Sequence, residues 1–321
     1  MIPCSRMLAA TLALLICSIG AIILGDRGAH AAEVECVRKY EISKPWPEDI
    51  AKAFWPSGFR PTAGMCEEGF LHGTIVKGDY EKVATLYRDN HRLLTAFHLL
   101  SPGGDAEEAM KIGRLFRRYL ITAHAPFEGS LQIHGPKNLC DANDQCECAS
   151  GCALIWFGAV YRFGKVGLHR PRTADPRFKT MAPADASVAY KRILDEISRY
   201  LEEMEAPRTA IDAMVTTSSS EISWVESGWF DRTLERPPSI AEWSDASCGS
   251  FTENEIEKAF ELVKKQPTGL TDNEKMLLQF LDKKGFNRDR CLVILFQSHI
   301  DRLPSPDVVA IDFEDLIPKH K

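Results

Sequence analysis

The chain has 321 residues, enough for one large domain or two smaller ones. A hydrophobic content of 45% and a charged content of 26% are ordinary for a globular protein with a sizeable core. The net charge of −6, without a basic stripe that carries interleaved aromatic residues, argues against a nucleic-acid partner.

The N-terminus has the pattern of an export signal. Arg6 provides a positive start, residues 7–24 form an apolar run, and Ala29 and Ala31 place small residues at both positions of a cleavage site. The pattern predicts a signal peptide over 1–31 and a periplasmic or extracellular protein. The alternative is an uncleaved run, near the lower length limit for a membrane span, that anchors the protein to a membrane.

The cysteines support the same compartment. Ten are present, and all but Cys4 and Cys17 lie beyond the expected signal. An even number in an oxidising compartment predicts disulfides, and short separations favour Cys36 with Cys66, a set within 140–152, and Cys248 with Cys291. Zinc held by the four cysteines of that middle set is the alternative, although their spacing is unusual for zinc. The eight disulfide candidates are Cys36, Cys66, Cys140, Cys146, Cys148, Cys152, Cys248 and Cys291.

Residues 32–69 contain four prolines and are expected to form an irregular lead-in. From residue 70 the pattern alternates between strands and helices, which is typical of an α/β domain with parallel strands. The elements expected in its first half are a strand over 70–76, a helix over 80–90, a strand over 94–100 and a helix that Asp105 caps.

The second half of this domain begins with a long loop over 121–149, rich in Gly, Asn, Asp and Cys, and loops of this length are often functional. A buried apolar helix over 153–159 and a short strand over 165–168 follow. After a polar loop over 172–186, the apolar spacing predicts an amphipathic helix over 187–205.

The C-terminal part has a different composition, which shifts at 232–245. Thr252 and Glu255 form a capping-box pattern that predicts a helix ending at Lys265. Another helix is expected over 271–284. We therefore expect residues 246–321 to be a small helical appendage, stapled by the Cys248–Cys291 disulfide.

Three short motifs carry the groups that serine-type acyl transfer requires. Gly103 and Gly104 follow an expected strand, Ser150 precedes the apolar helix, and His169 follows a second strand. Ligands of parallel sheets bind at the carboxyl ends of the strands, so the three motifs are expected to converge there. Ser150 would be the nucleophile, His169 the base, and Gly103, Gly104 and Gly151 the oxyanion hole.

The same motifs resemble the Clp protease proteolytic subunit (ClpP) and its crotonase-like relatives. The resemblance covers 70–231 and rests on Ser-Pro-Gly-Gly at 101–104, Ala-Ser-Gly at 149–151, Gly-Leu-His-Arg-Pro at 167–171 and the long helix. It implies a ClpP/crotonase-like spiral of ββα units and the same roles for Ser150 and His169. The two cysteines that flank the serine resemble predicted exported members of this superfamily.

The chain departs from the family at the third catalytic residue. The family's acid follows the long helix, but the matching positions here, 214–218, contain no acidic residue. Asp212 is the nearest carboxylate. Thr216 and Ser218 are neutral acceptors that would orient His169 without stabilising its charged form as well as a carboxylate does.

The expected function is an exported serine-type hydrolase that acts on a peptide or another acyl substrate, without a metal or cofactor. The alternative is a non-catalytic ClpP-like binding scaffold. Export argues against a cytosolic ATPase partner, and a homo-oligomer stays open. Cys148 or Cys152 as the nucleophile is the weaker alternative, because a disulfide leaves no thiolate.

Overall fold

The computed structural model describes residues 31–41, 59–126, 147–172, 176–227, 232–265 and 269–306. All of the expected signal peptide except Ala31 lies outside these residues. So do Cys140 and Cys146, and the predictions that concern them stay predictions.

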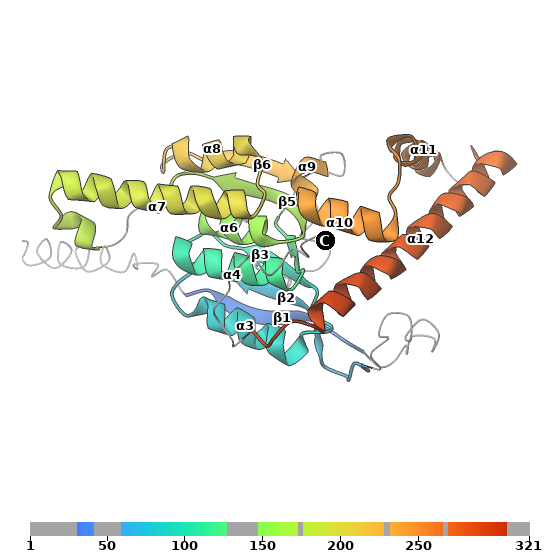
Figure 1. Ribbon diagram of the computed structural model, residues 1–321, viewed down its shortest axis with the longest axis horizontal. Coiled ribbons are helices and arrows are strands. Elements are labelled where there is room, and N and C mark those ends of the chain that lie inside the picture. The colour runs from blue at the N-terminus through green and yellow to red at the C-terminus, as the bar shows by residue number, and fades with distance from the viewer. Residues whose placement is uncertain are drawn as a thin grey trace, which may run out of the picture.

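Within the described residues, six strands form one mixed sheet whose order follows the chain (Figure 1). The first and last strand pairs are antiparallel and the three pairs between them are parallel. This confirms the α/β class. The strands are β1 Glu33–Lys39, β2 Cys66–His72, β3 Ala96–Leu100, β4 Thr122–His124, β5 Tyr161–Leu168 and β6 Ser223–Ser227.

Helices α3, α4 and α6 follow successive strands and pack side by side over one face of the sheet (Figure 1). Right-handed crossovers between neighbouring parallel strands place every crossover helix on the same face. The three helices span Asp79–Asn90, Ala106–Arg118 and Gly151–Gly158. The other helices are α7 Pro183–Glu203, α8 Arg208–Thr216, α9 Arg232–Glu235, α10 Pro238–Cys248, α11 Glu253–Lys264 and α12 Asp272–Ile300, with a short 3-10 helix at Pro176–Lys179.

The main core lies between the sheet and the three helices α3, α4 and α6. Side chains alternate along β3, so Phe97 points to the helices, where its ring lies 5.0 Å from that of Phe116 on α4. Every residue of α6 is buried. This explains why α6 is apolar on all sides, as a helix in the middle of a core must be.

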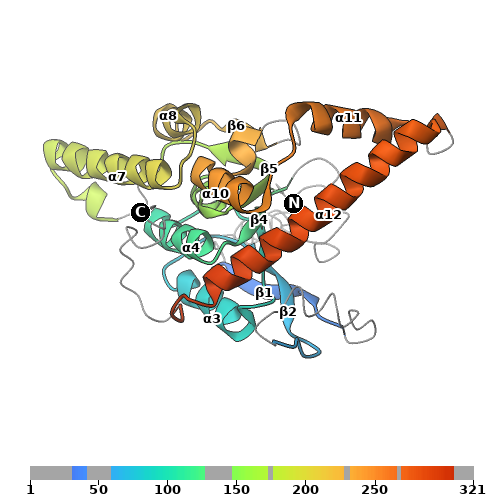
Figure 2. The same cartoon turned by 45° about the vertical axis from the view of Figure 1, so that its right-hand side comes forward.

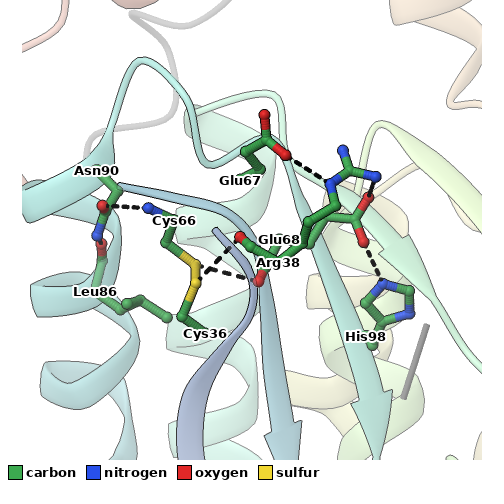
Figure 3. Close-up of a disulfide and its surroundings, with 8 residues drawn as sticks. All are labelled: Cys36, Arg38, Cys66, Glu67, Glu68, Leu86, Asn90 and His98. Atoms are coloured by element: carbon green, nitrogen blue, oxygen red, sulfur yellow. Dashed lines mark hydrogen bonds and ion pairs between the residues drawn. A yellow bond between two sulfur atoms is a disulfide. The ribbon is translucent and has the colours of Figure 1, made fainter. Parts of the chain in front are cut away.

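The first strand corrects the expectation of an irregular lead-in, which is wrong for Glu33–Lys39. Val34 and Cys36 pack against the core, while Glu35 between them faces outward. Figure 3 shows how the segment is fastened: the Cys36–Cys66 disulfide, which confirms one expected pair, joins β1 to β2. The Cys66 N–H donates to Asn90 Oδ1 at 2.7 Å and so ties β2 to the end of α3.

Two further elements differ from expectation. Residues Thr122–His124 form β4 inside the segment expected to be a loop. The second strand is Cys66–His72 rather than 70–76. The segment β4 has three residues, and its pairing with β3 and β5 rather than a pattern of its own makes it a strand. The seven residues of β2 are placed by their pairing with β1 and β3.

The helical appendage is present, and its helix α12 is longer than expected. Figures 1 and 2 show α12 as a long helix whose first half projects away from the sheet together with α11. The expected end at 284 is wrong, because α12 continues to Ile300. Its second half is held by Phe296, which stacks on Trp243 of α10 at 5.7 Å. The expected Cys248–Cys291 disulfide is confirmed and joins α10 to α12.

Candidate functional site

The three sequence motifs meet at the carboxyl ends of the parallel strands. Residues 147–149 run between the extended ends of β3 and β5, in parallel with both. Ser101 N–H donates to the Glu147 carbonyl at 2.8 Å, and Ser150 N–H donates to the Gly167 carbonyl at 2.9 Å. These hydrogen bonds place Ser150 beside the glycine pair on one side and near the end of β5 on the other.

Ser150 lies at a sharp turn between a strand and a helix. Its backbone angles are φ 55° and ψ −117°, and it is the residue before the first turn of α6. A positive φ is uncommon for a residue other than glycine and costs about 1–3 kcal/mol. The nucleophilic serine of α/β-hydrolases occupies the same kind of strained strand-to-helix turn, which exposes its hydroxyl.

The glycine pair packs directly against this turn. Gly103 has φ 99°, and a Cβ on it would lie 2.7 Å from the Ser150 Cβ. Gly104 has φ 146°, and a Cβ there would collide with the carbonyl of Ile75. Only glycine permits this backbone to approach the serine so closely.

The backbone N–H groups differ in availability. Gly103 N–H donates to Ser101 Oγ at 3.0 Å, so it is occupied within the loop. The N–H groups of Gly104 and Gly151 meet no acceptor among the described residues. Gly151 is also the first residue of α6, where the helix dipole favours negative charge. Gly104 and Gly151 are therefore the better donors for an oxyanion, and Gly103 provides the close approach.

His169 directly follows β5 and is partly exposed. Its Nδ1 lies 2.9 Å from the Arg170 carbonyl oxygen. A carbonyl can only accept, so Nδ1 is the donor, and in the neutral imidazole Nε2 then has the lone pair. This is the tautomer that a general base needs, and a backbone carbonyl rather than a carboxylate selects it.

The residues considered for the third position make their hydrogen bonds and ion pairs with groups other than His169 in the described structure. Asp212 lies on α8 and pairs with Arg208 at 3.1 Å, both side chains being more than half exposed. Thr216 Oγ1 donates to the Asp212 carbonyl at 2.7 Å. Ser218 Oγ lies 2.9 Å from Ser220 Oγ. The segment after α8 meets the neighbour of His169 instead, because Arg170 N–H donates to the Thr217 carbonyl at 3.0 Å.

Glu147 is a carboxylate in the described residues that interacts electrostatically with His169, and no sequence motif indicated it. Burial raises the pKa of the Glu147 carboxyl, and the positive form of His169 opposes that rise. The parallel pairing of Ala149 with Gly167 puts Glu147 and His169 on the same sheet face, with Glu147 level with Lys165 and His169 beyond the bridge at the other end. The sequence signal for this residue was an acid two positions before Ala149, but it lay within the segment 121–149 that was expected to be a loop.

A disulfide between Cys148 and Cys152 brackets the serine. Both residues are fully buried, and the bond joins the end of the strand to the first turn of α6. Disulfide sulfurs offer no thiolate, so this pairing removes the interpretation of either cysteine as a nucleophile. It likewise leaves no complete set of four thiolates for zinc.

Comparisons with known proteins add no family assignment. Neither the protein-family models nor the curated proteins with which the sequence was compared match it. In the described part of the chain, no helix is both long and apolar enough to cross a membrane.

Proposed function

We propose that this chain is an exported serine-type hydrolase of the ClpP/crotonase-like class, acting on peptides or other acyl substrates. Ser150 is the nucleophile and His169 the base. The observation that carries the proposal is the strained turn at Ser150, set at the start of a buried helix beside two free backbone N–H groups. Strain of this kind concentrates at functional sites.

The proposed reaction uses these groups in order. Ser150 Oγ attacks the acyl carbon while His169 Nε2 takes its proton, and the Gly104 and Gly151 N–H groups stabilise the oxyanion. His169 then returns the proton to the leaving group. A water molecule, deprotonated by the same nitrogen, releases the acyl group and restores Ser150.

Two coarser features support this class. Strands that follow the chain order, each of β2, β3 and β4 followed by a helix on one face of the sheet, give the α/β architecture that this class requires. The disulfides Cys36–Cys66, Cys148–Cys152 and Cys248–Cys291 suit an oxidising compartment, in keeping with export. Because a carbonyl orients His169, we expect slow turnover: a neutral acceptor stabilises the imidazolium less than a carboxylate does.

Labelling with a fluorophosphonate probe tests the proposal on the oxidised protein. Ser150→Ala is expected to abolish labelling, and His169→Ala to slow it by at least about 10²-fold, because the base is lost. Ser187→Ala, an exposed serine on α7, is the matched control and should label normally. A folded wild-type protein that never labels, or a Ser150→Ala variant that labels like wild type, would instead support the binding scaffold.

A further inference from the structure

One side of the first half of α12 is a row of exposed residues. The opposite side, which includes Leu281 with 4% exposure, meets α11, and Lys284 Nζ there lies 2.7 Å from Glu255 Oε1. The spacing along the exposed side alternates between four and three residues, which places its members on one line along a helix. This exposed row consists of Asp272, Met276, Gln279, Lys283, Phe286 and Arg290.

Along the second half of α12 the same line is a packing face. It continues, with the same spacing, through Val293, Gln297 and Ile300. Gln297 and Ile300 are each 8% exposed, and Gln297 Nε2 donates to the Arg92 carbonyl at 3.0 Å, close to the end of α3. The exposed row is the extension of this face beyond the domain, on the arm that projects from the sheet (Figure 2).

The exposed row and its border carry large apolar side chains. Met276 is 62% exposed and Phe286 is 54% exposed, and Phe280 beside the row is 58% exposed. These side chains lie on the side of α12 away from α11, so they contribute little to the packing of the two helices. Apolar groups gathered in this way among charged residues mark an interaction surface.

The order of residues along the exposed row is complementary to itself. When a second copy of the row runs antiparallel, with a two-fold axis level with residue 281, positions at equal distances from that axis face each other. Asp272 then faces Arg290 of the second copy, Met276 faces Phe286, and Gln279 faces Lys283. The Asp272 side chain is 96% exposed, so its pair with Lys275 on the same helix leaves it accessible.

We propose that the exposed rows of two α12 helices pair antiparallel and join two copies of this chain in a homodimer. The partner is a second copy because the row has an acid at one end and a base at the other, the arrangement that a two-fold interface needs. The polar residues Gln279 and Lys283 inside the row lower the stability of the pair and fix its register. The proposal does not depend on the hydrolase activity.

The size of the exposed row sets the strength of this dimer. Residues 272–290 of α12 extend over about 28 Å. A pair of helices in contact over that length gives an interface at the small end of the range for specific complexes. We therefore expect a reversible dimer with a dissociation constant of about 10 µM.

Sedimentation velocity of the oxidised protein between about 1 and 100 µM should follow its conversion from monomer to dimer. Phe286→Asp should raise the dissociation constant at least about tenfold, because the change occurs twice in each interface. Val188→Asp on α7 is the matched control, since Val188 is also 54% exposed, and it should leave the dimer intact. A protein that stays monomeric, or a dimer that only Val188→Asp weakens, would overturn the proposal.

A charge exchange tests the antiparallel register. Arg290→Asp should weaken the dimer about tenfold, because it sets two acids opposite each other at both ends of the interface. Adding Asp272→Arg to the same chain should restore most of the loss. These two residues are 18 positions apart on one helix, about 27 Å, so only a contact between copies can produce the rescue. A further loss in the double variant would reject this register.

Cross-linking locates the same pairs directly. Met276→Cys protein mixed with Phe286→Cys protein should form a disulfide-linked dimer under mild oxidation. Either variant alone should not, because the two copies of one position lie about 15 Å apart along the helices, and a disulfide needs Cα atoms within about 7 Å. Equal cross-linking of the separate variants, or none in the mixture, would overturn the pairing.

Discussion

At the scale of single residues, Ser150 owes its unusual backbone to its neighbours. Its N–H is held by the Gly167 carbonyl, while its own carbonyl accepts from Ala153 N–H at 3.0 Å in the first turn of α6. Gly103 closes the remaining side. The turn is thus fixed from three directions, which is what a strained conformation needs in order to persist.

Glu147→Gln should change the pH dependence of the reaction. Burial raises the pKa of the Glu147 carboxyl, and the positive form of His169 opposes that rise, so the ionised carboxylate is lost as the pH falls through the raised pKa. The rate that this carboxylate supports should therefore be lost at the acid side of the wild-type profile, and Glu147→Gln should lack that acid-side change. The maximum rate should fall, because the imidazolium formed in the reaction loses a partner. Phosphonate labelling rates across pH measure both.

Asp212→Asn is the matched control for that experiment. Its carboxylate is exposed and paired with Arg208, so the labelling rate should stay within about twofold of wild type. A large loss in Asp212→Asn with an unchanged profile in Glu147→Gln would give the acidic role to Asp212.

At the scale of elements, the Cys148–Cys152 disulfide should maintain the serine turn. Replacing both cysteines with alanine reopens a short loop, and chain entropy alone predicts a loss of about 2 kcal/mol in the free energy of unfolding. Because the released turn no longer holds Ser150 in place, labelling should slow by more than the loss of folded protein explains. Urea unfolding, with labelling under conditions where the variant is folded, separates the two effects. Full labelling by a folded variant would show that the serine turn does not need the disulfide.

Local motifs made the site partly predictable, and tertiary contacts account for what was missed. The glycine pair, Ser150 and His169 each stand at the end of a strand, so their convergence followed from the rule for parallel sheets. The acid Glu147 lay in an expected loop whose end becomes a strand only by pairing with Ser101 and Gly167.

The elements of the fold were likewise predictable where the local pattern was strong and not where tertiary contacts decide. The segment β4 has three residues, too few for a pattern of its own. Helix α12 passes Gly285 and continues because Phe296 stacks on Trp243, a contact between helices far apart in the sequence. Strong periodicity, as in α7, was enough to locate an element, and weak or interrupted patterns were not.

At the scale of the whole molecule, the appendage is fastened separately from the site. Replacing Cys248 and Cys291 with alanine opens a loop spanning 43 positions of the chain, with an entropic cost of up to about 4 kcal/mol in unfolding free energy. The phosphonate labelling rate should nevertheless match wild type, because α12 meets β5 at Tyr161, at the end opposite to His169. Calorimetric melting and labelling on one preparation measure both. Slower labelling in a folded variant would show that the appendage supports the site.

The order of the strands also bears on how the chain assembles. Each strand pairs with the one synthesised just before it, so a chain that emerges end first can extend the sheet one strand at a time over short loop closures. The end of α12 and the residues after it are different, because Gln297 reaches the Arg92 carbonyl and Tyr119 reaches the Pro304 carbonyl. These contacts span most of the domain, so the last segment closes onto the earliest crossover helices only after the sheet is built. Fast local growth is then followed by one slow, long-range closure.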